Sequence, residues 1–154
     1  MGYMIKTINQ DMFKADADVL VHQVNCQGVM GSGVAYQVKQ LYPEAFERYR
    51  NLCSNARDYE RHKLLGEAQV VCVGEKYIVN LFAQEKYGYD GAVYTNYDAL
   101  RASVIDMKRK LPSSTLKIAI PYHMGCCRGG GDWNIVSKII EDELSDYEVM
   151  ICKI

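Results

Sequence analysis

The chain has 154 residues, a length that fits one compact domain, and 49% of them are hydrophobic, which is enough for a sizeable core. Its formal net charge of -1 provides no basic field, so a nucleic-acid partner is not expected. No apolar run approaches the roughly 20 residues that a membrane span needs, and no signal-peptide pattern opens the sequence. We expect a cytoplasmic monomer with no membrane partner.

Apolar and alternating runs predict strands over residues 3–8, 19–24, 68–73, 77–82, 116–120 and 147–152. Apolar residues at three- and four-residue spacing predict helices over 34–52, 97–111 and 136–144. Pro43 interrupts the first of these and predicts a kink or two helices. Residues 74–76 fit a hairpin, and the polar segment 54–65 is expected to be a mobile loop. Intermixed strands and helices predict an α/β layered domain with a mixed sheet.

The six cysteines include no Cys-x-x-Cys pair, so the sequence predicts neither a zinc ribbon nor a thioredoxin motif. We expect reduced thiols in or near the core and no metal site. For the two cysteines of the glycine loops, Cys26 and Cys126, the alternative is that they line a ligand site or are reactive.

Two glycine-rich loops, at residues 24–35 and 121–133, each follow a predicted strand and lead into a predicted helix. Glycine permits positive φ and a close backbone approach, and N–H groups at a helix N-terminus bind oxyanions. Two such loops on one sheet predict a ligand with two neighbouring phosphates. The alternative is that the glycines only make tight turns. This fits the second loop less well, because ordering the glycine-rich run 128–131 costs conformational entropy that a short turn would not require.

The sequence lacks the functional residues of two common phosphate-binding motifs, the Rossmann fingerprint and the P-loop. Gly31-Ser32-Gly33-Val34-Ala35-Tyr36 lacks the third glycine of the Rossmann fingerprint. Val34-Ala35 stands where a P-loop requires Lys and Ser or Thr, so ATP-Mg²⁺ chemistry has no support.

The loops and their order resemble those of macrodomains. Residues 25–35 resemble the first ligand loop of that family, residues 121–131 resemble its second loop, and Asp11 resembles its early aspartate. The resemblance covers residues 1–154 as a single domain. Within the family, residues 22–36 are similar to the ADP-ribose-1″-phosphate phosphatase type, and the region of Trp133 also resembles the terminal ADP-ribose glycohydrolase branch.

The resemblance implies a three-layer α/β/α fold, with a cleft that binds ADP-ribose and needs no cofactor. Asp11, beside Met12, would accept a hydrogen bond from the adenine amino group, and Asn25 would bind the distal ribose. One phosphate would be surrounded by Gly31, Ser32, Gly33 and Val34. The pyrophosphate and distal ribose would be wrapped by Gly125, Cys126, Cys127, Arg128 and Gly129.

Two residues are candidates for catalysis. Asp132 fits the N-cap of the last helix, and it also fits a general base that orients water. His22 fits a satisfied core histidine, and it also fits a residue that positions water or protonates a leaving oxygen. The phosphatase type includes a member with histidine at the matching position, which favours the second role.

The remaining polar loop residues leave alternatives open. Arg128 either pairs with a phosphate or is a solvated charge, and His123 either faces solvent or joins the site. Tyrosines 87, 89 and 94 either cover the ligand or pack on a helix. The catalytic aspartate of the glycohydrolase branch falls on Gly129 here, and its lysine has no clear match, although Lys86 is nearby.

The resemblance implies a metal-independent hydrolase that acts at the distal ribose of an ADP-ribose derivative. Candidate substrates are ADP-ribose-1″-phosphate, O-acetyl-ADP-ribose and ADP-ribosylated protein. The alternative is a non-catalytic ADP-ribose-binding module. A nucleic-acid-associated domain is a third class, which the mild acidity disfavours.

Overall fold

The computed structural model describes residues 5–31, 33–88 and 90–154. The strands within these ranges are β1 (Ile5–Asn9), β2 (Val19–Val24), β3 (Ala68–Val73), β4 (Lys76–Phe82), β5 (Lys117–Pro121) and β6 (Glu148–Lys153). The helices are α1 (Gly33–Leu41), α2 (Pro43–Asn55), α3 (Tyr97–Lys110) and α4 (Trp133–Glu143), with the short 3-10 helices η1 (Met12–Lys14) and η2 (Asp58–Leu64).

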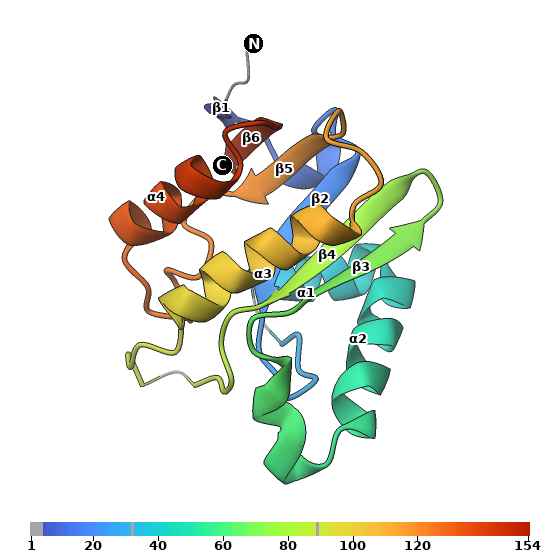
Figure 1. Ribbon diagram of the computed structural model, residues 1–154, viewed down its shortest axis with the longest axis vertical. Coiled ribbons are helices and arrows are strands. Elements are labelled where there is room, and N and C mark those ends of the chain that lie inside the picture. The colour runs from blue at the N-terminus through green and yellow to red at the C-terminus, as the bar shows by residue number, and fades with distance from the viewer. Residues whose placement is uncertain (1–4, 32, 89) are drawn as a thin grey trace.

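The strands form one mixed sheet in the order β1-β6-β5-β2-β4-β3. Neighbouring strands are parallel, except that β3 and β4 form an antiparallel hairpin. Helices α1 and α2 cover one face of the sheet, and α3 and α4 cover the other (Figure 1). The predicted three-layer α/β/α fold with a mixed sheet is confirmed.

The central strand β2 supplies both cores. Its Val19 and Val21 pack with α3 and α4, whereas Leu20 and Val24 pack on the side of α1 and α2. Successive side chains of a strand point to opposite faces, so a strand buried on both faces reads as one apolar run. This is why the bounds of β2 could be predicted from the sequence.

The segment around Pro43 behaves as predicted. Helix α1 ends at Leu41, and Pro43 opens α2 in its first turn, where proline's missing N–H costs no hydrogen bond. The expectation of a loop over 54–65 was wrong, because η2 forms there. Arg61 Nε donates to the carbonyl of Cys53 at 3.1 Å, and Leu64 is buried, so η2 is attached to the end of α2.

The cysteines divide by position. Cys53 and Cys152 are buried as predicted, and Cys26, for which two positions were considered, is buried as well; Cys72 and Cys127 are exposed, and all are free thiols. None of the helices in the described part of the chain is long and apolar enough to cross a membrane.

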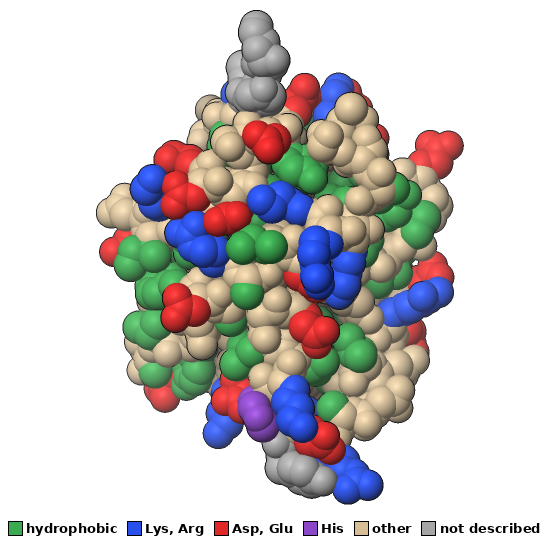
Figure 2. All heavy atoms as spheres, in the orientation of Figure 1, with side chains coloured by type: hydrophobic (Ala, Val, Ile, Leu, Met, Phe, Trp, Pro, Cys, Tyr) green, Lys and Arg blue, Asp and Glu red, His purple; other side chains and the backbone are tan. Residues whose placement is uncertain are grey.

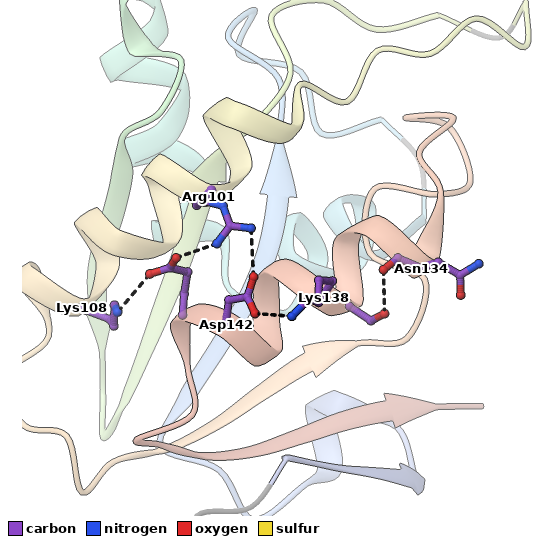
Figure 3. Close-up of polar contacts among 7 residues, drawn as sticks. Arg101, Lys108, Asn134, Lys138 and Asp142 are labelled. Carbon is purple, nitrogen blue, oxygen red and sulfur yellow. Dashed lines mark hydrogen bonds and ion pairs between the residues drawn. The ribbon is translucent and has the colours of Figure 1, made fainter.

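Ion pairs join α3 to α4 on the outside of their layer (Figure 3). Arg101 Nη1 lies 2.7 Å from a carboxylate oxygen of Glu143, and Nη2 lies 3.2 Å from one of Asp142. Lys108 on α3 also approaches Glu143 at 3.4 Å, and within α4 Lys138 approaches Asp142 at 2.8 Å. Acidic and basic side chains are intermixed over this face of the molecule (Figure 2).

A second ionic contact fixes α3 against the sheet. Asp106 accepts a hydrogen bond from the backbone N–H of Ala68 at 2.9 Å and pairs with Lys110 at 2.7 Å. Burial raises the pKa of the Asp106 carboxyl, but the Ala68 N–H and the Lys110 ammonium outweigh it and lower that pKa to about 2.

Candidate functional site: a cleft between two glycine loops

The candidate site lies where β2 and β5 end side by side. From β2 the chain crosses to α1 and α2 on one face, and from β5 it crosses to α4 on the other face. Such a switch point opens a crevice at the carboxyl ends of the strands, where α/β proteins bind ligands. A cleft of about 240 Å³ occupies this position.

Three loops line the cleft. Residues of 25–35 form one wall, residues of 121–129 form the other wall, and residues of 84–88 complete the lining. The two glycine loops, about a hundred residues apart in sequence, therefore face each other across one cavity.

Asn25 anchors the first loop. Its Nδ2 donates to the carbonyl of Val29 at 2.9 Å, and its Oδ1 accepts from the N–H of Gln27 at 2.9 Å. The hydroxyl of Tyr49 on α2 lies 2.8 Å from both the carbonyl oxygen and Oδ1 of Asn25, which share its one hydrogen. Asn25 also lines the cleft, and the second hydrogen on Nδ2 is the part of its amide left to meet a ligand.

The N-terminus of α1 opens onto the cleft. Gly31, Gly33 and Val34 line it, and their contacts with a ligand stay a prediction, whereas Ser32 lies outside the described residues. The first N–H groups of a helix have no partner within the helix and point outward along its dipole. Gly33 has a φ of +60°, a value that glycine adopts without strain.

The second loop is tightly packed. The carbonyl of Gly125 accepts from the N–H of Gly131 and from the Thr95 hydroxyl, both at 2.8 Å. The carbonyl of Gly129 accepts from the N–H groups of Tyr94 and Thr95. A Cβ on Gly129 would lie 2.5 Å from the Thr95 hydroxyl and 2.6 Å from the Gly125 carbonyl. These contacts fix the loop, and residue 129 must be glycine for it to close.

Side chains of the second loop divide between cleft and core. Cys127, Arg128 and His123 line the cleft. Cys126 does not line it, because its thiol turns back to the carbonyl of Met124, and burial raises its pKa to about 11. A thiol with that pKa is protonated at neutral pH and is not a nucleophile.

Two residues that line the cleft, Tyr122 and His123, belong to an aromatic group. His123 has a φ of +63° and stacks on Tyr122, with ring centroids 3.9 Å apart. Trp133, the first residue of α4, packs against both rings. Tyr87 lines the cleft and is exposed, whereas Tyr89 lies outside the described residues.

The predicted aspartates lie outside the cleft lining. Asp132 is exposed and caps α4, with its carboxylate accepting from the N–H of Asn134 at 2.9 Å. Asp11 caps η1 in the same way, accepting from the N–H of Phe13, and Met12 beside it is buried. A catalytic role for Asp132 and ligand contacts of Asp11 and Met12 stay predictions.

His22 lies in the cleft lining and is 2% exposed. Its Nε2 lies 2.5 Å from Oδ1 of Asn80, and its Nδ1 has no partner among the described residues. Burial lowers the pKa of His22 to about 4, although the Asn80 bond opposes this effect. The imidazole is therefore neutral at physiological pH.

Sequence reasoning missed Gln23 and Gln84 in the cleft lining. Nε2 of Gln23 donates to Oε1 of Gln84 and to the Thr95 hydroxyl, each at 2.8 Å, which joins the end of β2 to the segment between β4 and α3. These residues could have been found in the sequence as polar side chains at the carboxyl ends of apolar strands. Gln23 lies at the end of β2, and Gln84 lies just beyond β4.

The charge of the cleft suits an anion. Among the described residues that line it there is no Asp, Glu or Lys, and Arg128 supplies positive charge. No three His, Cys, Asp or Glu side chains in the described ranges come together as a metal site. The arrangement offers backbone N–H donors at its walls and neutral side chains at its floor.

Comparison with known proteins gives consistent matches. The DNA ADP-ribosyl glycohydrolase of Mycobacterium tuberculosis is 33% identical over 155 residues, covering 96% of this chain and 42% of the relative. The ADP-ribose 1''-phosphate phosphatase of Aspergillus oryzae is 25% identical over 188 residues, covering 95% of this chain and 92% of the relative. The chain thus spans less than half the length of the mycobacterial relative.

Solved structures match over the whole fold. The macrodomain of Mycobacterium tuberculosis DarG superposes with a TM-score of 0.79 at 29% identity, covering 98% of both chains. No protein-family model matches the sequence. The fold, the two facing loops and these relatives together show that the chain belongs to the macrodomain family.

Proposed function

We propose that the chain binds ADP-ribose in this cleft and hydrolyses an ADP-ribose derivative at the distal ribose. The observation that carries the proposal is the opposition of the α1 N-terminus and the second glycine loop across one cavity that has Arg128 but no carboxylate in its described lining. A diphosphate fits between two such sets of N–H donors. The relatives named above are hydrolases of ADP-ribose compounds, which supports the same substrate class.

The diphosphate would lie between the walls. Gly31, Gly33 and Val34 would donate backbone N–H groups from one side, and Gly125 and Cys127 from the other. Arg128 and Gly129 would complete the second wall. A guanidinium suits this position, because it binds phosphate oxygens in a bidentate manner.

His22 is the residue that we propose for the chemical step. The described cleft lining has no carboxylate, so the neutral imidazole of His22, which can accept a hydrogen bond, is the group placed to position the attacking water. Water would attack the distal ribose or its substituent, while the nucleotide end holds the substrate in place. Asp132 caps α4 outside the lining, so we assign it to the stability of that helix.

A non-catalytic binding module is the second candidate function. It is favoured by the same absence of carboxylates from the described lining, because acid-base catalysis then depends on few groups. Turnover separates the two candidates.

The test is product release. The wild-type chain would be incubated with ADP-ribose-1″-phosphate, with ADP-ribosylated protein and with ADP-ribosylated DNA, and phosphate or free ADP-ribose would be measured. We expect release from at least one substrate, and a His22→Gln variant should be slower by about 100-fold. Tight ADP-ribose binding without release from any of the three would leave only the binding module. A cytoplasmic location and a monomeric state stay predictions.

A further inference from the structure

Three polar side chains form a row across the sheet beneath the cleft. His22 on β2 is paired in register with Asn80 on β4, and Asn80 is paired with Gln69 on β3. Asn80 is fully buried and His22 nearly so. Polar groups in such an interior are retained only with hydrogen-bond partners.

The hydrogen bonds along this row have one direction. Nε2 of Gln69 donates to the carbonyl of Arg48 on α2 at 3.1 Å, which leaves Oε1 of Gln69 to accept from Nδ2 of Asn80 at 3.1 Å. Oδ1 of Asn80 must then face His22, at 2.5 Å from Nε2. Because an amide oxygen only accepts, Nε2 of His22 carries the hydrogen.

The tautomer of His22 follows from this row. A neutral imidazole carries one hydrogen, so Nδ1 is left with a lone pair and acts only as an acceptor. Nδ1 is buried and has no partner among the described residues, while His22 lines the cleft. A buried acceptor without a partner is costly, and a ligand or water that donates to it removes the cost.

We propose that Nδ1 of His22 accepts a hydrogen bond from an O–H group on the floor of the cleft, and that Asn80 and Gln69 are positioning residues that fix the tautomer. The inference rests on the proposed function, since it takes the cleft as the ADP-ribose site. The donor is a ribose hydroxyl or a bound water.

The same lone pair excludes phosphate from this position. A phosphate oxygen is itself an acceptor, so it has no hydrogen to offer Nδ1 and would be repelled by it. Phosphates are thereby confined to the N–H donors of the walls, and the ribose or the attacking water is brought to the floor. His22 thus sets the orientation of the ligand in the cleft as well as contacting it.

Nitrogen-15 NMR of the full chain tests the tautomer directly. The chain has three histidines, and the His22 signals are identified as those lost in His22→Gln. We expect Nε2 to be protonated and Nδ1 bare in the free protein, with a shift of the Nδ1 resonance when ADP-ribose is added. If the Nδ1 resonance shifts with ADP-ribose but not with ADP, the donor is a hydroxyl of the distal ribose. If it shifts with either ligand, the donor is water or a hydroxyl of the nearer ribose. Both results support an O–H donor.

A hydrogen on Nδ1 of the free protein, or an Nδ1 resonance that ADP-ribose leaves unchanged, overturns the inference. Calorimetry on the same sample separates this failure from that of the proposed function. If ADP-ribose binds and Nδ1 does not respond, the inference alone is wrong. If ADP-ribose does not bind, the proposed function is wrong.

Variants of the row test the positioning role. Gln69→Leu releases the Asn80 amide and should give a mixture of His22 tautomers with about tenfold weaker ADP-ribose binding. Gln69→Glu keeps the acceptor for Asn80 and should restore the single tautomer. A Gln69→Leu spectrum identical to that of the wild type would show that the row has no positioning role.

Discussion

The buried state of His22 predicts how stability depends on pH. The unfolded chain binds a proton at this side chain with the ordinary pKa of 6.5, whereas burial lowers the native pKa to about 4. Between these values the unfolded state binds more protons, so stability is complete above pH 6.5 and falls as the pH decreases. Integrated over this window, the loss at pH 5 is about 2 kcal/mol relative to pH 7.5.

Chemical denaturation at pH 7.5 and pH 5 measures this loss. In His22→Gln the pH-dependent part of the unfolding free energy should shrink by about 2 kcal/mol, whatever the variant's stability at pH 7.5. The matched control is His62→Gln, which replaces an exposed histidine on η2 and should keep the wild-type pH dependence. Asp106 does not contribute to this difference, because its pKa of about 2 places its effect on the free energy of unfolding below pH 5. An equal pH dependence in wild type and His22→Gln would refute the neutral, buried imidazole.

Three further predictions follow from packing, capping and charge. Gly129→Ala should lower stability by about 2 kcal/mol and abolish ADP-ribose binding, because its Cβ meets a backbone carbonyl at 2.6 Å. Normal ADP-ribose binding by the Gly129 variant would contradict the packing of the second loop. The control is Gly74→Ala, at a φ of +61° with open space around it, which should lower the free energy of unfolding by about 1 kcal/mol and leave the calorimetric affinity for ADP-ribose unchanged. Asp132→Ala should lower the stability measured by thermal unfolding by about 1 kcal/mol, because the N-cap of α4 is lost. Asp132→Asn should keep both the cap and the turnover. An Asn variant that is stable but inactive would show that Asp132 is catalytic. Asp106→Ala should lose about 2 kcal/mol at neutral pH, because a buried backbone N–H is left unpaired, and ADP-ribose affinity should not change; stability equal to wild type would show that this contact contributes nothing.

Strands and loops whose structure is determined by nearby residues could be predicted from the sequence. Val19–Val21 and Val24 are apolar because both faces of β2 are buried, and Pro43 separates two helices because it lacks an N–H. The glycine loops could also be located, since a strand, glycines and a helix lie consecutively in the chain. The 3-10 helix over 58–64 could not, because its attachment depends on a contact with the end of α2.

The floor of the site depends on partners that are distant in the sequence. Asn80 lies 58 residues from His22, and Gln69 reaches it only through the β3–β4 hairpin register. Nothing local in the sequence distinguishes these amides from ordinary strand residues. Asp132 is a different case, because its residue type fits both an N-cap and a base; the structure shows the cap, and the catalytic role stays a prediction.

Calorimetric titration with ADP-ribose and with ADP tests the central claim most directly. The two glycine loops offer N–H donors to the diphosphate, and the floor offers acceptors to the ribose beyond it, so ADP-ribose should bind one-to-one with micromolar affinity. ADP lacks the distal ribose and should bind about tenfold more weakly. Equal affinities for the two ligands, or no binding of ADP-ribose, would contradict the assignment of this cleft.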